Sequence, residues 1–486
     1  MKRTRLFPWI SHPAAGMLAL LLFLAGCTVV GPDYIPPAAP APAAWHTPLP
    51  DGLSPDSENS GRLAQWWRTL EDPVLSDLVA RAVGGNLDLR QARERVREAR
   101  ARRGIDQAAL FPTIDATGDV YRRRASETSG GNGNETDFYV AGFDAGWEID
   151  VFGGVRRSIE AAEADLGASE ADLTDVLVSL TAEVGLNYLE VRTYQTRLDV
   201  AEANIAAQQA TYDLIRRQYQ AGLNDELAVQ QARYNLENSR SQVPALRTGL
   251  AAAQNRLAVL TGQAPGSLHT MLEKRLPIPV PPATVAVGVP AETLRRRPDV
   301  RRAERELAAQ SARIGEAVAD LYPKFRLIGS IGLESVETGD FFLSSSRYWS
   351  IGPGVSWKVF DAGAIRNNIA VQTAAAERIR YAYESAVLGA LEEVENALTA
   401  YAEEQLRRER LLDAVEAARK AADLAQNQYA AGLVDFSSVL DAQRSLLSFQ
   451  DELAQSDGSV TSNLISLYKA LGGGWTAAFS ADPKTG

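Results

Sequence analysis

One cysteine near the amino terminus is the residue whose surroundings most clearly specify a chemical reaction. Basic residues and an apolar run, Met17 to Leu24, precede the small pair Ala25-Gly26 and then Cys27. This is a signal peptide (1–26), because a membrane-spanning helix needs about 20 apolar residues. The lipobox pattern predicts cleavage after 26 and acylation of the Cys27 thiol, which would anchor the chain in outer-membrane lipid; the alternative is an ordinary buried cysteine. Thr28, in place of an aspartate, favours sorting to the outer membrane of a Gram-negative cell.

The remaining composition argues against catalytic and metal sites. Cys27 is the only cysteine. One of the three histidines lies in the signal peptide, and the other two, His46 and His269, are far apart in the sequence. A zinc site or a nucleophile–histidine pair needs more than this, and we expect no enzyme, no metal and no cofactor. The net charge of −11 becomes −14 without the signal. An acidic body argues against nucleic acid as a partner, and acids interleave the basic run at 295–302.

Proline-rich segments divide the mature chain. Eight prolines fall between Pro32 and Pro55, and six fall between Pro277 and Pro298. The first group predicts an extended tether, 27–64, between the lipid anchor and the folded body. The second group predicts a linker, 271–290, between two folded parts.

The two parts repeat each other at an offset of 210 residues. Matching pairs are Trp147 and Trp357, Tyr219 and Tyr429, Gly222 and Gly432, Val229 and Val439, and Gly262 and Gly472. This period is too long for a solenoid, whose units run roughly 20–50 residues. We therefore predict a duplicated domain with copies at 65–270 and 291–474, followed by a tail at 475–486.

A seven-residue apolar repeat predicts long, supercoiled helices in both copies. In the first copy its members are Leu177, Val184, Val191, Leu198, Ile205, Tyr212 and Tyr219. In the second copy Arg408 and Ala422 interrupt it. A helix from 155 to 219 would be on the order of 100 Å long. We predict helical hairpins over 155–260 and 364–471.

Each predicted hairpin turns at a glycine. Gly222 and Gly432 suit the left-handed conformation that ends a helix. After each glycine come an apolar residue and then an aspartate at the next N-cap position, namely Leu223 with Asp225 and Leu433 with Asp435. The tips are expected near 219–225 and 429–435.

Alternating apolar and polar residues predict two strands in each copy. In the first strand Ile114, Ala116, Gly118 and Val120 alternate with Thr113, Asp115, Thr117 and Asp119. Alternation over about ten residues is typical of a transmembrane β-barrel, although a soluble amphipathic hairpin shows it too. The four strands are expected near 113–124, 138–152, 325–335 and 347–360, joined within each copy by surface loops.

Four strands cannot close a barrel, since the smallest known barrels have eight. Unpaired strand edges are not tolerated in hydrocarbon. The chain should therefore oligomerise, to twelve strands as a trimer or sixteen as a tetramer. The helices would continue the barrel as a tube, which makes the chain an α+β membrane protein.

Several blocks of this sequence resemble the TolC-like outer-membrane efflux family, in its OprM-type lipoprotein branch. They are Cys27–Tyr34, Trp66-Trp67 with Asp72-Pro73, Arg296–Val300, Val439–Leu446 and Leu467–Trp475. The resemblance implies a homotrimer with a twelve-stranded β-barrel and an α-helical coiled-coil barrel. It also implies a passive efflux duct that docks to a periplasmic adaptor and an inner-membrane RND-type pump.

The resemblance also implies a gate and a docking surface. Asp441 matches the acidic gate position, and three copies would form an acidic ring; the competing interpretation is a solvated surface acid. Some relatives carry a second acid where this chain has Ser438, and the first copy has Gln231 where the second has Asp441. We therefore expect the second hairpin to move and the first to act as scaffold. The residues matching adaptor-docking tips are Tyr219, Gly222, Leu223, Tyr429, Gly432 and Leu433, although turn geometry alone would explain the glycines.

Two other functions stay open. An outer-membrane duct for oligosaccharide or protein export would show the same patterns. A periplasmic adaptor also uses a lipid anchor and helical hairpins, but it would leave the four alternating strands unexplained.

Overall fold

The computed structural model describes residues 29–38, 41–49, 53–54, 56, 60–131, 133–282 and 284–475. The predicted signal peptide, the acylated Cys27 and the tail beyond 475 lie outside the described residues. Within these ranges no helix has the length and apolar character needed to cross a membrane.

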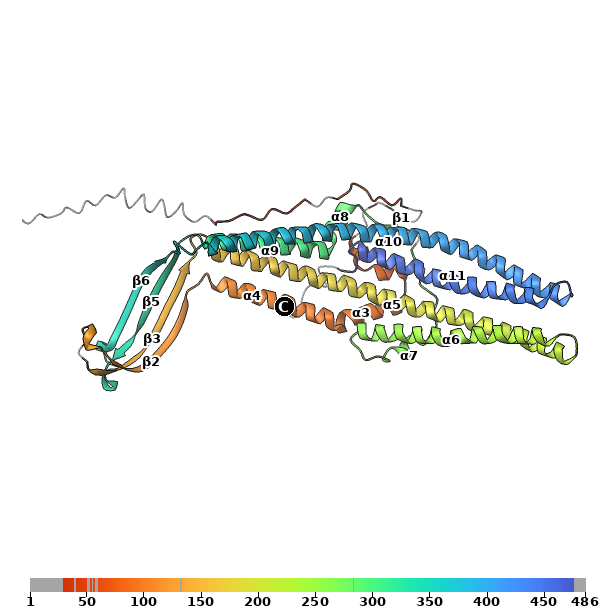
Figure 1. The fold of residues 1–486 in the computed structure, drawn as a ribbon, viewed down its shortest axis with the longest axis horizontal. Coiled ribbons are helices and arrows are strands. Elements are labelled where there is room, and N and C mark those ends of the chain that lie inside the picture. Colours follow the sequence, from red (N-terminus) through yellow and green to blue (C-terminus); the bar gives the residue numbers. More distant parts are fainter. Residues whose placement is uncertain are drawn as a thin grey trace, which may run out of the picture. The chain divides into compact units, whose positions relative to one another are not determined.

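Two copies of one element series follow each other along the chain (Figure 1). In the first copy the series is α3 (Pro73–Gly85), α4 (Leu87–Ala108), β2 (Thr113–Arg124), β3 (Glu135–Ile149), α5 (Gly154–Gln220) and α6 (Glu226–Leu260). In the second it is α8 (Pro290–Arg296), α9 (Pro298–Ala319), β5 (Lys324–Ser335), β6 (Arg347–Ser356), α10 (Ala364–Ala430) and α11 (Phe436–Ala470). Helices α5 and α10 both have 67 residues, and α6 and α11 both have 35. The predicted α+β fold with tandem repeats and long helical hairpins is confirmed.

The shorter elements lie ahead of α3, inside the strand loops and between α6 and α8. They are β1 (Leu53–Ser54), α2 (Ser60–Ala64), η1 (Trp66–Leu70), η2 (Glu127–Ser129), α7 (His269–Leu272), β4 (Val285–Ala286), η3 (Thr338–Asp340) and η4 (Ser344–Ser346). Strand β1 pairs in parallel with β4 of the inter-repeat segment. The linker between the copies is therefore part of the folded body.

The chain forms two compact units, and neither coincides with a sequence repeat. The strand unit contains the described residues up to Pro37, Val96–Ala168 and Ala303–Tyr383. The hairpin unit contains the described residues of Ala38–Arg95, Ser169–Arg302 and the chain from Glu384 onward. Each unit takes matching pieces from both copies, because two amphipathic helical hairpins bury their apolar stripes against each other rather than alone.

The strand unit holds one antiparallel sheet in the order β2-β3-β5-β6. Strand β3 of the first copy pairs with β5 of the second, in a register that runs from Tyr139 opposite Ser335 to Ile149 opposite Phe325. Strands β2 and β6 are the edges, so each presents an unpaired row of backbone groups within one chain.

The two faces of the sheet differ in polarity. Directly paired residues point to the same side, so the register assigns each residue to one face. One face carries Ile114, Val120, Phe143, Ile331, Trp349, Ile351 and Val355, all more than half exposed. The opposite face carries Asp115, Thr117, Asp119, Asp144, Glu148, Ser330 and Ser350. Within the described part of the chain, this apolar sheet face is therefore largely exposed.

The second strand ends at Ile149, three residues before the end expected from the alternation. Asp150 turns away and caps α5, since its carboxylate accepts hydrogen bonds from the backbone N–H groups of Val155 (3.3 Å) and Arg156 (3.0 Å). Asp361 does the same for α10, accepting from Ile365 at 2.8 Å and Gly363 at 2.9 Å. These hydrogen bonds, led by the one from Ile365, lower the pKa of Asp361. Both long helices thus begin at a carboxylate just after a strand.

The segment predicted as a tether has no helix or strand over 29–38 and 41–49, but its predicted bounds, 27–64, also include strand β1 and helix α2. Several of its described residues contact the folded parts of the protein. In the strand unit, the side chain of Arg157 is almost completely buried and donates to Val30 O (3.1 Å), Gly31 O (3.3 Å) and Asp33 Oδ1 (2.7 Å). In the hairpin unit, Glu395 accepts hydrogen bonds from the backbone N–H groups of His46 (2.7 Å) and Thr47 (3.0 Å). The proline-rich composition indicated the backbone conformation and gave no signal for these contacts.

The hairpin unit contains most of the apolar core. Trp66, almost fully buried, stacks on Tyr468 with ring centroids 5.9 Å apart. A Cβ on Gly185 would lie 2.6 Å from the Trp66 ring and 2.9 Å from Ile465, so this helix position has room only for glycine. The core thus joins the beginning of the first copy to the end of the second.

Both copies close their hairpins with a side chain from the residue just before the helix that precedes the strands. Asn86 donates from Nδ2 to Leu260 O at 3.0 Å, and Arg297 donates from Nη1 to the equivalent Ala470 O at 2.7 Å. Arg297 also pairs with Asp299 at 2.8 Å and Glu393 at 2.6 Å. One buried C-terminal carbonyl of α6 therefore accepts from a neutral amide, and the equivalent carbonyl of α11 accepts from a guanidinium.

Candidate functional site

The two hairpin tips have the same backbone geometry. Gly222 has φ +73° and Gly432 has φ +72°. At the first tip Leu223 N donates to Gln218 O (2.8 Å), and at the second Leu433 N donates to the equivalent Gln428 O (2.9 Å). This pattern is a Schellman motif. A Cβ would meet no atom within 4 Å at either glycine, so the positive φ rather than a lack of space requires glycine here.

The leucines that follow the glycines point into solvent. Leu223 is 79% exposed and Leu433 is 74% exposed. A Schellman motif usually buries the residue at this position against the last helical turn. Both tips therefore present an apolar side chain that the fold of one chain does not use.

The tyrosines at the two tips differ in their contacts. The Tyr429 hydroxyl accepts a hydrogen bond from Asn224 Nδ2 (2.8 Å) and donates to Gln218 Oε1 (3.4 Å), both on the first hairpin. The Tyr429 ring also packs on Phe436. Tyr219, its counterpart, is 43% exposed. Within one chain only the second tyrosine ties the two tips together.

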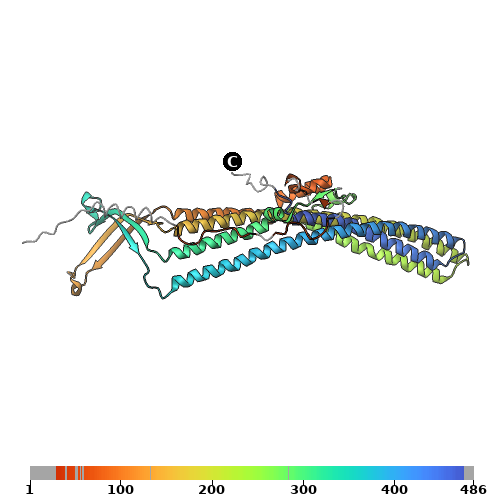
Figure 2. The same cartoon turned by 90° about the horizontal axis from the view of Figure 1, so that it is seen from above.

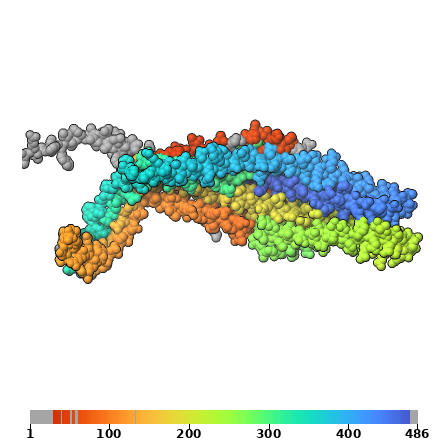
Figure 3. Space-filling view, in the orientation of Figure 1, coloured from red at the N-terminus to blue at the C-terminus, as the bar shows by residue number. Residues whose placement is uncertain are grey.

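A small apolar cluster packs the tips against each other behind these residues. It contains Ile215, Ala228, Val229, Ala232, Phe436, Val439 and Leu440. The two hairpins lie side by side in this part of the molecule (Figures 2 and 3). The sequence repeat placed these residues on matching helices and did not reveal which of them meet.

The starts of α6 and α11 use their aspartates differently. Asp225 accepts a hydrogen bond from Ala228 N at 2.8 Å, as an N-cap should. Asp435 stands at the same position, but its side chain makes no capping bond. The expected N-cap position is right in both copies, and the carboxylate performs that role in only one.

Asp441 lies on α11 with 73% of its side chain exposed. Its carboxylate has an ion pair with Arg444 Nη1 at 3.3 Å. Asp441 pairs with Arg444 and accepts a hydrogen bond from the Ser445 hydroxyl, and neither of these is one of the six predicted tip residues. The geometry leaves most of this carboxylate facing solvent, as a gate acid or a plain surface acid would be.

Arg444 connects the two hairpins and was missed in the sequence. Its Nε donates to Asn235 Oδ1 on α6 at 2.8 Å, its Nη2 donates to the Tyr234 hydroxyl, and its guanidinium lies 5.2 Å from the Tyr234 ring centroid. Asn235 is buried. The available signal was the spacing of Asp441 and Arg444, which puts them on one helix face. Arg444 therefore couples the Asp441 carboxylate to the first hairpin.

The polar face of the sheet forms a second candidate region. Thr117 donates to Asp144 at 3.0 Å, and the hydroxyls of Ser330 and Ser350 are 2.7 Å apart. Asp115 and Asp144 stand directly opposite each other. Such a surface suits contact with water and small polar solutes.

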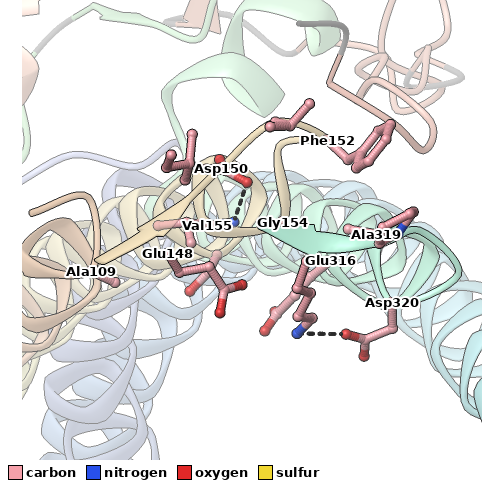
Figure 4. Close-up of a pocket in the computed structure, with 14 residues that line it drawn as sticks. Ala109, Glu148, Asp150, Phe152, Gly154, Val155, Glu316, Ala319 and Asp320 are labelled. Carbon is pink, nitrogen blue, oxygen red and sulfur yellow. Dashed lines mark hydrogen bonds and ion pairs between the residues drawn. The ribbon is translucent and has the colours of Figure 1, made fainter. Parts of the chain in front are cut away.

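A cavity of about 300 Å³ lies where the strands meet the helices of the strand unit (Figure 4). Glu148, Asp150, Glu316 and Asp320 line it, and Lys324 pairs with Asp320 at 3.0 Å. Burial, with the nearby charges of Asp320 and Asp106, raises the pKa of Glu316. Among the described residues no cluster of histidine, cysteine and acidic side chains could hold a metal ion.

Comparison with known proteins gives consistent matches along the chain. A family model described as "Outer membrane efflux protein" matches residues 78–263 and 289–473. "Nodulation protein T" of Rhizobium leguminosarum bv. trifolii is 31% identical over 466 residues, covering 95% of this chain and 97% of that protein. "Solvent efflux pump outer membrane protein SrpC" of Pseudomonas putida is 33% identical over 466 residues, covering 94% of this chain and 97% of that protein.

A solved structure has the same fold. The outer-membrane channel OprN superposes with a TM-score of 0.86 at 36% identity, covering 92% of this chain and 99% of that one. The likeness thus extends over both copies and over both compact units.

Proposed function

Because the chain belongs to the outer membrane efflux protein family, and is an outer-membrane efflux channel rather than an enzyme, we propose that three copies form the passive exit duct of a tripartite RND-type pump. The duct would carry drugs or other small toxic compounds from the periplasm to the exterior. Its energy would come from the inner-membrane pump through a periplasmic adaptor.

The single observation that carries this proposal is the sheet with one apolar face and two free edges. Backbone groups at free edges in hydrocarbon cost several kcal/mol each, so β6 of one copy should pair with β2 of the next. Three copies give twelve strands, within the range of known barrels. The polar face, with Asp115, Thr117 and Asp144, would then line the lumen. A periplasmic adaptor has no use for such a sheet.

The tips are proposed as the adaptor-docking surface. Leu223 and Leu433 are exposed on rigid turns, and the pairs Tyr219-Gly222 and Tyr429-Gly432 shape those turns. Six such tips would surround the periplasmic end of a trimer. Apolar anchors on rigid elements are typical of protein interfaces.

The gate is proposed to lie at Asp441, where three copies would form an acidic ring. Arg444 would hold each Asp441 to the first hairpin of its own chain. Opening would loosen the second hairpin from the first. Of the matching positions Gln231, Ser438 and Asp441, one carries an acid.

The acyl groups on Cys27 are proposed to anchor the chain beside the base of the sheet. Val30 N donates to Phe152 O at 3.1 Å, and Arg157 holds the residues that follow. The tether at 27–64 would therefore fix the level of the anchor. The other proposed domains are the two copies, at 65–270 and 291–474, and the linker between them at 271–290.

The proposed duct predicts a phenotype and an oligomer. Deletion of the gene should sensitise cells to drugs or solvents, and detergent extraction of outer membranes should yield a particle of three chains. L223D together with L433D should fail to restore resistance while still giving the trimer. V280D, in the linker at 78% exposure, is the matched control and should restore it. A monomer in detergent, or unchanged sensitivity after deletion, would contradict the proposal.

A further inference from the structure

Three arginines lie on the apolar face of the sheet, at the strand ends farthest from the helices. Arg122 and Arg124 end β2, and Arg347 begins β6. Alternate residues of a strand share a face. Arg122 stands two residues beyond Val120, and Arg347 stands two residues before Trp349. These three residues, the outward arginine band, therefore extend the apolar face at its loop end.

The position along the strand places the outward arginine band at the edge of the hydrocarbon. Counted from Ile114, Arg122 is the ninth residue of β2, and a tilted strand crosses the hydrocarbon in about 9–11 residues. An arginine costs about 2–4 kcal/mol at the bilayer midplane and about 0–1 kcal/mol near the interface. The arginines thus lie where lipid headgroups begin.

The charge of Arg347 is not balanced within the sheet. Its partner in register is Leu333, and within the part of the chain that the structure describes its exposed side chain makes no hydrogen bond or ion pair. The matching pair in the first copy is Arg122 opposite Asp137, which form a two-point ion pair at 2.7 and 2.8 Å. In the second copy Leu333 stands in place of Arg122, and Arg347 stands in place of Asp137. Arg347 is therefore free to bind an external anion.

Closure of the barrel would gather the arginines, and this step rests on the proposed function. Arg347 lies on one edge strand and Arg122 and Arg124 lie on the other. Pairing of β6 with β2 of the next copy would bring three guanidinium groups together at each of three subunit boundaries. Tyr139 and Ser335, on the same face, add hydroxyl groups beside them.

We propose that the outward arginine band is a binding surface for a phosphorylated glycolipid of the outer leaflet. Planar guanidinium groups bind phosphate oxygens in a two-point manner. Arg122 already holds Asp137, but among the described residues Arg124 and Arg347 make no ion pair, so each boundary offers two guanidinium groups to phosphate. Two such groups suit a headgroup with more than one phosphate better than a phospholipid with a single phosphate. The neighbouring hydroxyls suit the sugar.

Lipid retention measured on the full-length, acylated protein tests the proposal. The protein is placed in phosphatidylcholine nanodiscs that contain an equal small fraction of a bis-phosphorylated glucosamine lipid, its dephosphorylated form or phosphatidylglycerol. Retained lipid is then counted by native mass spectrometry. We expect the phosphorylated glycolipid to be retained on the order of tenfold more than the other two, and the preference to weaken at high salt.

Variants locate the surface. R347Q should lower retention, R347K should restore part of it, and R122Q/R124Q/R347Q should remove the preference. R123Q is the matched control, since Arg123 lies on the same strand and the opposite face. Equal retention of the three lipids, or an equal loss in R123Q, would overturn the proposal. Particle mass and bilayer conductance are measured in parallel, so that failure of the trimeric duct is distinguished from failure of lipid binding.

Discussion

The two copies of the repeat share a backbone and differ in how their side chains are used. Gly222 and Gly432 turn the chain with nearly equal φ values. Around them, Tyr429 bonds across to the other tip, whereas Tyr219 stays exposed. The duplication has preserved the helical scaffold and changed the residues at its surface.

The largest differences lie where one hairpin meets the other. Arg444 of the second copy corresponds to Tyr234 of the first, and the two are in contact within one chain. Asp441 likewise corresponds to Gln231. In the proposed ring each hairpin has one neighbour in its own chain and one in the next chain. Unequal copies therefore make those two boundaries chemically different.

Substitution of the two end-capping residues should have the largest effect on stability. Arg297→Ala should lower the stability of the protein by about 3 kcal/mol, because it leaves Asp299 and Glu393 without their buried partner. Asn86→Ala should cost about 1–3 kcal/mol, since it removes two neutral hydrogen bonds, one to Leu260 O and one from Leu89 N. Thermal unfolding in detergent measures both. Equal midpoints would show that the two caps are equivalent.

Release of the link between the hairpins should have the next largest effect. Arg444→Ala removes the hydrogen bonds to Asn235 and Tyr234, and it should raise the open probability of the isolated channel on the order of tenfold. Single-channel recording in planar bilayers measures this. Tyr234→Phe keeps the ring under the guanidinium and should produce a smaller rise. An unchanged open probability for Arg444→Ala would place the moving boundary between chains instead.

The gate acid should have a smaller and more specific effect. Asp441→Ala should raise the conductance of the isolated trimer, because it removes three carboxylates from the proposed ring. Gln231→Ala, at the matching position of the first copy, should leave conductance unchanged. If Asp441→Ala conducts like the parent protein, Asp441 is a surface acid.

The N-caps at the tips should show the smallest difference. Asp225→Ala should destabilise the first turn of α6 by about 1 kcal/mol, since it removes the bond from Ala228 N. Asp435→Ala should change α11 little, because that carboxylate caps nothing. Hydrogen exchange of the amides in the two first turns compares them directly. Equal protection losses would contradict the assigned difference.

Features set by short stretches of sequence could be predicted. The heptads, the tip glycines and the strand alternation each depend on neighbours within one turn or one strand, and so they are visible in a single copy. Contacts between the copies were not predictable. Arg444 and Asn235 are 209 positions apart, and no local sequence pattern predicts their hydrogen bond. The same holds for Arg157 and Asp33, where composition indicated a free tether and the fold supplied a binding partner.

The stacking of Trp66 on Tyr468 has a consequence for how the protein is made. A chain that crosses the inner membrane from its amino terminus delivers Trp66 early and Tyr468 among the last residues. Until then the Trp66 ring lacks its stacking partner, and the apolar surface around it stays open to aggregation. This part of the core can therefore close only after Tyr468 has been exported.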